Sequence, residues 1–134
     1  MIPAATRKRA RARRTGSVPP DSLGALRAAL RRFATARDWE QFHSPKNLVM
    51  ALSVEAAELL EHFQWLRQAE SAALPRAKRT QVEEEMADVL LYLIRLADRL
   101  DVDLIAAARR KMRLNARKYP VAKSRGSSRK YTEF

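Results

Sequence analysis

Two pairs of acidic residues share the same spacing in this chain. Glu55 and Glu58 lie three residues apart, and so do Glu85 and Asp88. Residues three apart on a helix project from one face, and apolar neighbours make an unpartnered carboxylate costly at both places. Two charges about 4 Å apart repel by about 4 kcal/mol at an effective dielectric of about 20. Two such pairs facing each other would need a cation, and for a purely carboxylate site we expect Mg²⁺.

An aromatic residue follows each acid pair toward the helix C-terminus. Trp65 comes seven residues after Glu58 on a stripe that includes His62, and Tyr92 comes four residues after Asp88. At 1.5 Å per residue, Trp65 would lie about 10 Å beyond Glu58. This separation suits a ligand with an anionic end and a flat ring, such as a nucleoside triphosphate, because aromatic faces stack on bases.

A polar face further along the chain fits the same ligand. Lys111, Asn115 and Lys118 are spaced to share one side of a helix. A lysine can neutralise phosphate, and an asparagine can bind a base edge through its donor and acceptor. Plainer interpretations stay open, since Glu-x-x-Glu often marks a solvated face, and Trp39 and Trp65 can serve as core or hinge packing.

Helical periodicity runs through most of the sequence, and no alternating strand pattern interrupts it. Ser44 followed by Pro45 is a strong helix start, and Asp103 is a good N-cap for the last helix. Pro75 can open the third helix, with a competing capping box from Thr80 to Glu83. We therefore predict an all-α fold resembling a four-helix bundle, with helices at about 22–38, 45–67, 75–100 and 103–119 and a loop at 68–74.

Length and charge narrow the function classes. The 134 residues fit one domain, the chain has no cysteine, and no apolar run approaches the about 20 residues that span a bilayer. The formal charge is +12, yet residues 21–116 hold 15 basic and 14 acidic side chains. The excess lies at the ends, which argues against sequence-specific nucleic-acid binding, and the lack of a long apolar run argues against a membrane protein. We expect a cytoplasmic protein.

The two basic ends have separate interpretations. Residues 1–20 hold six Lys or Arg and no acid, and we interpret them as a disordered basic leader, with a transit peptide as the alternative. Residues 21–120 form the predicted all-α domain. Residues 121–134 form a basic C-terminal segment whose cations can close over a bound triphosphate.

Taken together, the motifs resemble the all-α nucleoside triphosphate pyrophosphohydrolases of the MazG type, and within them the dCTP pyrophosphatase branch. The family pattern of Glu-x-x-Glu on one helix and Glu-x-x-Asp on the next matches the two acid pairs. Branch-like segments are RDWEQFHSPKNL, EAAELLEHFQW, EEEMADVLLYL, the KM-x-x-N stretch ending in KYPV, and SSRKYTEF. The resemblance covers about residues 29–134. It departs at Val54, where many members have a further Glu, and at Leu30, where some animal relatives have a substrate-contacting His.

The resemblance implies a Mg²⁺-dependent enzyme that cleaves between the α- and β-phosphates, converting dCTP to dCMP and pyrophosphate. It also implies a bundle completed by oligomerisation, as a tetramer or a dimer. Glu55 or Glu58 would orient the attacking water as the catalytic residue. The metal would be held by Glu55, Glu58, Glu85 and Asp88. The nucleotide would be bound by Trp39, Trp65, Tyr92, Lys111 and Asn115.

Three other functions fit parts of the sequence. An enzyme of the same fold could hydrolyse other canonical or damaged nucleotides, because base choice depends on small differences in pocket size. A non-enzymatic helical protein could bind nucleic acid through its basic ends, but that leaves the acid pairs unused. A purely structural bundle leaves them unexplained as well.

Overall fold

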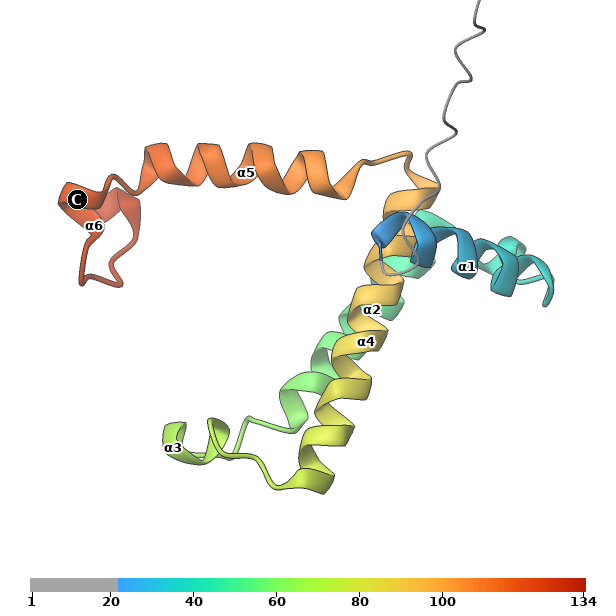
Figure 1. Ribbon diagram of the computed structural model, residues 1–134, viewed down its shortest axis with the longest axis horizontal. Coiled ribbons are helices and arrows are strands. Elements are labelled where there is room, and N and C mark those ends of the chain that lie inside the picture. The colour runs from blue at the N-terminus through green and yellow to red at the C-terminus, as the bar shows by residue number, and fades with distance from the viewer. Residues whose placement is uncertain (1–21) are drawn as a thin grey trace, which may run out of the picture.

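The computed structural model describes residues 22–134, and over that range the chain is helical, with no strand. Helices α2 (Pro45–Glu61) and α4 (Arg76–Arg99) run antiparallel and pack along their length, and α1 (Leu23–Thr35) crosses α4 near its C-terminal end (Figure 1). The predicted all-α class is confirmed. The predicted basic leader, residues 1–20, lies outside the described residues.

The predicted helix starts are confirmed by their caps. The Ser22 hydroxyl accepts a hydrogen bond from the Ala25 backbone N–H at 3.1 Å, and the Ser44 hydroxyl accepts one from Asn47 at 3.2 Å. Asp103 caps α5 (Leu104–Lys118) in the same way. Such side chains satisfy backbone donors that have no partner within the helix. Helix α4 begins after Pro75, so the competing start at Thr80 is not used.

The predicted helix ends were less accurate. Helix α1 stops at Thr35 rather than near residue 38, and α2 stops at Glu61 rather than at Arg67. Residues 62–66 form tight turns, in which Phe63 N–H donates to the Leu60 carbonyl at 2.9 Å. The predicted loop at 68–74 contains a short helix, α3 (Gln68–Ser71). Periodicity alone did not reveal these stops, because neither glycine nor proline marks them.

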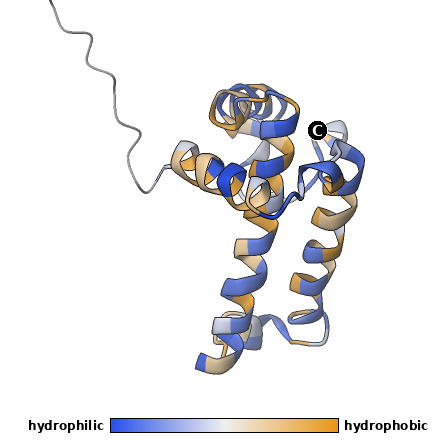
Figure 2. Cartoon of the chain, turned by 90° about the vertical axis from the view of Figure 1, so that its right-hand side faces the viewer, coloured by the Kyte–Doolittle hydropathy of each residue, from blue (hydrophilic) through white to orange (hydrophobic). Residues whose placement is uncertain are grey.

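A small core joins the three packed helices. It consists of one residue or more from each of α1, α2 and α4: Ala34, Leu48, Val82, Ile94 and Ala97. Hydrophobic and hydrophilic residues are both found along the whole of each long helix (Figure 2), and the 3–4-residue spacing of the hydrophobic ones gives a helix an apolar face. Much of that apolar surface is left exposed by the single chain, as at Met50, Val54, Met86 and Leu90. A single chain therefore buries only part of the apolar surface that its helical pattern predicts to be buried.

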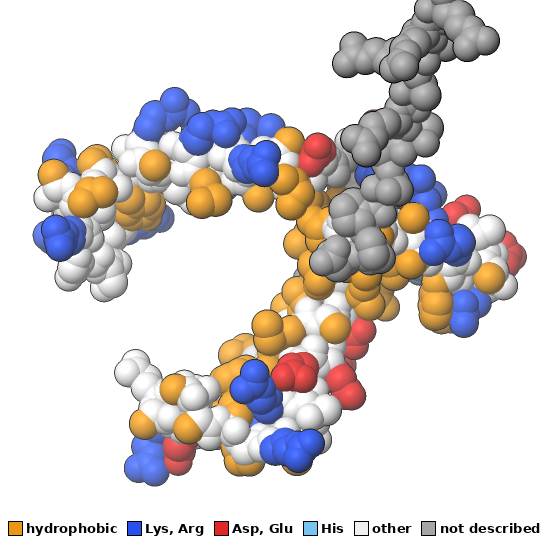
Figure 3. All heavy atoms as spheres, viewed as in Figure 1, with side chains coloured by type: hydrophobic (Ala, Val, Ile, Leu, Met, Phe, Trp, Pro, Cys, Tyr) orange, Lys and Arg blue, Asp and Glu red, His pale blue; other side chains and the backbone are white. Residues whose placement is uncertain are grey.

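Helix α5 leaves the packed helices instead of closing a bundle with them. Asp101 has a positive φ of 54°, in the left-handed region, and this turn redirects the chain after α4. Figure 1 shows α5 extending away from the α2–α4 pair. Its hydrophobic side chains lie mainly on the side facing the pair, and Lys and Arg lie mainly on the opposite side (Figure 3). The four-helix arrangement is thus open within one chain.

The C-terminal segment folds against the end of α5. It contains two short helices, α6 (Val121–Ser124) and η2 (Tyr131–Glu133), where the sequence predicted no regular structure. The ring of Tyr119 contacts those of Tyr131 and Phe134, with centroids 5.8 and 5.9 Å apart. No helix within residues 22–134 is both long enough and apolar enough to cross a membrane.

Candidate active site

Three carboxylates from two helices meet between α2 and α4. Oxygen atoms of Glu55, Glu58 and Glu85 all lie within 4.8 Å of one another. Glu55 and Glu58 share a face of α2, as their spacing predicts. Because α4 packs along α2, Glu85 is brought to the same face. The oxygen-only donor set fits a hard divalent cation.

The electrostatics of this acid cluster favour a cation. Burial raises the pKa of Glu55, and the charges of Glu58, Asp88 and Glu85 raise it further. Asp88 lies outside the tightest group of three, yet its charge acts on Glu55. Like charges held this close disfavour ionisation, so a bound cation would stabilise the ionised set. The charges of the other three predicted metal ligands therefore all act on Glu55.

A basic pair adjoins the cluster. The Lys78 Nζ atom lies 2.9 Å from His62 Nδ1, and His62 Nε2 lies 3.8 Å from a carboxylate oxygen of Glu85. An ammonium group can only donate hydrogen bonds, so Nδ1 accepts and the ring proton resides on Nε2. His62 thus presents an N–H toward the side of the cluster formed by Glu85.

An apolar cavity of about 350 Å³ opens between α1 and α4 beside Asp88. Its walls include both Trp39 and Tyr92, and the apolar side chain of Leu30. Pockets of this size and apolar character, with a few polar groups, are typical of small-molecule sites. The structure therefore places two of the predicted aromatic residues in one cavity with one of the predicted metal ligands.

Trp39 owes its position to a turn after α1. Asp38 adopts a positive φ of 53°, and its side chain and backbone carbonyl accept hydrogen bonds from the Gln41 amide. The turn returns the chain toward α1, where the Trp39 ring meets Phe33 edge-on with centroids 5.7 Å apart. The indole is 43% exposed, so one part packs and another part is free to contact a ligand.

Three predicted nucleotide contacts are not gathered at this cavity. Trp65 was predicted to continue the stripe of Glu58 on α2, but the helix ends at Glu61, and Trp65 is 87% exposed beyond it. Lys111 and Asn115 are exposed on α5, which runs away from the pair that holds the acid cluster. Within a single chain, these residues do not line the cavity with Trp39 and Tyr92.

Sequence reasoning overlooked the polar end of the cavity. Arg95 lies on α4, three residues after Tyr92, and its side chain is only 5% exposed. It donates a hydrogen bond to His43, which lines the same cavity. The available signal was an arginine inside the apolar stripe of α4, because a buried charge requires partners. Those partners are Glu40, His43 and Asp98.

Comparison with known proteins now decides the family. The sequence pattern of the MazG-like family matches residues 50–134. This chain belongs to the MazG-like family. It is 48% identical to human dCTP pyrophosphatase 1 over 119 residues, which cover 87% of this chain and 69% of the human protein. The mouse dCTP pyrophosphatase 1 is 47% identical over 118 residues, with the same two coverages.

A solved structure supports the MazG-like assignment. The crystal structure of a pyrophosphatase from Archaeoglobus fulgidus superposes with a TM-score of 0.70 and 45% sequence identity. The match covers 73% of this chain and 92% of the archaeal chain. The recognition made from the acid pairs and flanking segments is therefore confirmed at the level of the family.

Proposed function

We propose that this protein is a Mg²⁺-dependent nucleoside triphosphate pyrophosphohydrolase that converts dCTP to dCMP and pyrophosphate in the cytoplasm. The observation that carries the proposal is the adjacency of the acid cluster and the aromatic cavity, which share Asp88 at their border. A triphosphate at the carboxylates and a base in the cavity match that arrangement. The names of the human and mouse relatives support dCTP as the substrate.

The four acids divide into two roles in this proposal. Glu55, Glu58, Glu85 and Asp88 would hold the metal, which when bound neutralises phosphate charge and lowers the pKa of a bound water. Glu55 or Glu58 would also accept or orient a proton of the attacking water.

The base would enter the cavity between α1 and α4. Trp39 and Tyr92 offer ring faces there, and stacking on an aromatic is worth about 1–3 kcal/mol per base. The opposite end of the nucleotide would lie at the carboxylates, since Asp88 lines the cavity and also acts on Glu55. This orientation uses the geometry of one chain alone.

The other predicted contacts require a second copy of the chain. Trp65, Lys111 and Asn115 lie away from the cavity of their own chain, and we propose that they act at the site of a neighbouring subunit. Exposed hydrophobic side chains on the long helices support assembly into a dimer or tetramer: Val49, Met50, Val54, Met86, Leu90, Leu93, Ile105 and Met112. Burying such surface is the main driving force of association. Light scattering coupled to size exclusion tests this, and a monomer at all concentrations would contradict it.

The basic C-terminal segment, residues 121–134, would close over a neighbour's triphosphate. It follows α5, and its Tyr131 and Phe134 rings pack against Tyr119 at the far end of that helix. Its cations include Lys123, Arg125 and Arg129. Truncation after Tyr119 should raise KM for dCTP sharply, whereas unchanged kinetics would remove the closing role.

A panel of nucleoside triphosphates, assayed for pyrophosphate release with and without Mg²⁺, tests the proposed activity. We expect release from dCTP only with Mg²⁺. Glu58→Gln should abolish turnover without loss of helicity, because one oxygen ligand is replaced by an amide. Glu61→Gln is the matched control, since Glu61 is exposed at the end of the same helix and is not in the acid cluster. Full activity of Glu58→Gln would contradict the metal-site assignment.

Hydrolysis of other canonical or damaged nucleotides is the alternative within the same fold, and the same panel separates the two. It is favoured if another triphosphate has a higher kcat/KM than dCTP. Binding of nucleic acid by the basic ends without hydrolysis would instead give retention on a polyanion column and no pyrophosphate. The acid cluster argues against that outcome, because binding through the basic ends would leave it without a role.

A further inference from the structure

The cavity between α1 and α4 has two chemically different ends. Asp88 lies at one end, and its charge acts on Glu55 of the acid cluster. Arg95 lines the same cavity seven residues later on α4, which corresponds to about 10 Å along the helix axis. His43 lines the cavity beside Arg95. A nucleotide whose phosphates approach Asp88 would therefore direct its base toward His43 and Arg95.

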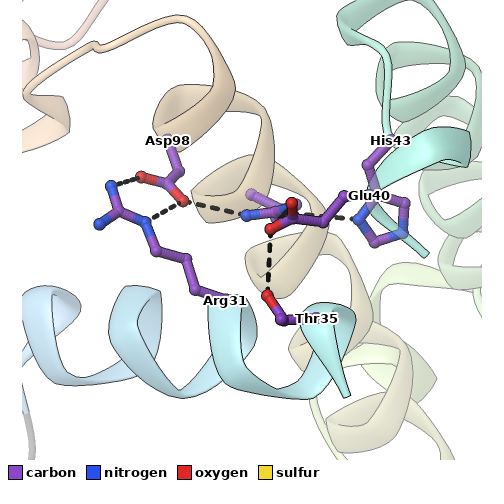
Figure 4. A network of polar contacts seen from close by, with 6 residues as sticks. Arg31, Thr35, Glu40, His43 and Asp98 are labelled. Carbon is purple, nitrogen blue, oxygen red and sulfur yellow. Dashed lines mark hydrogen bonds and ion pairs between the residues drawn. The ribbon is translucent and has the colours of Figure 1, made fainter. Parts of the chain in front are cut away.

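Arg95 is held in place by a network that Figure 4 shows. Its Nη1 donates to an Asp98 carboxylate oxygen at 3.1 Å, and Asp98 also accepts hydrogen bonds from Arg31. Its Nε donates to His43 Nδ1 at 3.1 Å. Its buried Nη2 makes no hydrogen bond within residues 22–134 and lies 3.6 Å from a Glu40 oxygen. The guanidinium is thus fixed from two sides.

This network determines which ring nitrogen of His43 carries the proton. A guanidinium has donors only and stays charged in proteins, so Nδ1 of His43 must accept. Burial and then the charges of Arg95 and Arg99 lower the pKa of His43, which keeps the ring neutral near pH 7. The proton of the neutral ring therefore resides on Nε2. No hydrogen bond to that nitrogen is formed among the described residues, so it is available as a donor.

We propose that His43, held as the Nε2–H tautomer by Arg95, donates a hydrogen bond to the unprotonated ring nitrogen N3 of a cytosine seated in the cavity. The inference rests on the proposed function and adds the contact that selects the base. Cytosine carries an acceptor at N3, whereas uracil and thymine carry an N–H there. Two donors that face each other lose a hydrogen bond and leave polar groups unsatisfied. His43 is thus a specificity-determining residue, and Arg95 is a positioning residue.

Binding of the product nucleotides dCMP and dUMP in the presence of Mg²⁺ tests the contact by calorimetry, without turnover. His43→Phe keeps an aromatic ring but removes the donor, and should weaken dCMP binding about tenfold while leaving dUMP binding within about twofold. His43→Gln should restore most of the dCMP preference, because its amide supplies a donor. Thr35→Val is the control, since Thr35 contacts Glu40 in the same network but lines no part of the cavity.

The role of Arg95 has a spectroscopic test. Histidine ¹⁵N chemical shifts should report the Nε2–H tautomer of His43 in the unmodified protein, and a mixture of tautomers in Arg95→Met. That variant should also raise KM for dCTP more than it lowers kcat, and Arg95→Lys should rescue part of the effect. An Nδ1–H tautomer in the unmodified protein would overturn the inference even if Arg95→Met fails to fold.

The outcomes separate this inference from the proposed function. Hydrolysis of dCTP together with an unchanged dCMP to dUMP ratio in His43→Phe would remove the base-reading role and leave the enzyme assignment intact. Absence of any pyrophosphate release would remove the proposed function, while the tautomer of His43 and the nucleotide affinities would still be measured directly. A loss of dCMP preference restored by His43→Gln supports the inference.

Discussion

His62 bridges Lys78 and the acid cluster, with its Nδ1 atom 2.9 Å from Lys78 Nζ. The opposite ring nitrogen faces Glu85 at 3.8 Å. Groups behind a metal ligand orient it, and their loss typically weakens metal binding by about 10–100-fold. These contacts place His62 behind a predicted metal ligand.

Removal of this bridge should weaken metal binding. His62→Leu and Lys78→Met should each reduce Mn²⁺ affinity about tenfold in calorimetry of the nucleotide-free protein, because the polar group 3.8 Å from Glu85 is removed or loses its own support. Arg79→Met is the control, since Arg79 pairs with exposed Glu83 and not with the cluster. Equal affinities in all three variants would show that the bridge does not orient Glu85.

Stability should depend on pH through Glu55. Burial and its acidic neighbours raise the pKa of Glu55 in the folded protein above the unfolded value of 4.5. The folded state then binds more protons, so the free energy of unfolding falls as pH rises from 4.5 through the folded pKa. Urea denaturation in EDTA should show this decline in the unmodified protein and a smaller one in Glu55→Gln.

The acidic side of that profile has a different cause. Hydrogen bonds from Arg31 lower the pKa of Asp98, so its contribution is present above 3.8 and is lost as pH falls through the folded pKa. The pH ranges in which Glu55 and Asp98 change the free energy of unfolding do not coincide. Asp98→Asn should therefore alter only the loss of stability at the lower pH. A decline above pH 4.5 that persists fully in Glu55→Gln would assign it to other groups.

The two tryptophans should respond differently to assembly. Trp39→Ala should weaken dCMP binding by about 1–3 kcal/mol at any protein concentration, because its ring lines the cavity of its own chain. Trp65→Ala should weaken it only where the chains are assembled, because the indole is remote and 87% exposed in one chain. Calorimetry above and below the dissociation concentration separates the two, and a concentration-independent Trp65 effect would contradict the shared site.

Complementation between inactive chains tests the shared site directly. Glu58→Gln damages the acid cluster, and Lys111→Ala damages the remote lysine on α5. Mixed assemblies that contain both variants should recover part of the dCTP hydrolysis, because one pairing restores an intact site. Two preparations of the same variant, mixed in the same way, are the control. Activity that never exceeds the sum of the separate variants would place Lys111 and Glu58 in one chain's site or exclude Lys111 from it.

The sequence predicted the grouping of the acidic side chains better than the rest of the candidate site. Local spacing placed Glu55 and Glu58 on one face, and the caps Ser44 and Asp103 fixed two helix starts. Helix ends were harder, because the turns after Glu61 contain no glycine or proline to mark them. Helix periodicity therefore carried Trp65 further along α2 than the backbone does.

The remaining differences arise from contacts between distant segments. Arg95 and His43 are 52 residues apart, and no local pattern predicts that one fixes the tautomer of the other. Burial of Arg95 depends on how α1 crosses α4, and the local sequence around Arg95 does not reveal this packing. The direction of α5 is set by Asp101 in a short turn. It decides the position of residues far from that turn, and a local sequence pattern does not predict it.

The turn at Asp101 sets the direction of α5. Helix α5 has 15 residues and a length of about 22 Å, so a small rotation at Asp101 becomes a displacement of several ångströms at its far end. Aspartate tolerates the left-handed backbone there, and a β-branched residue does not. Asp101→Val would thus change the direction of the whole of α5 without altering the carboxylates. The spacing between neighbouring subunits would change as a result.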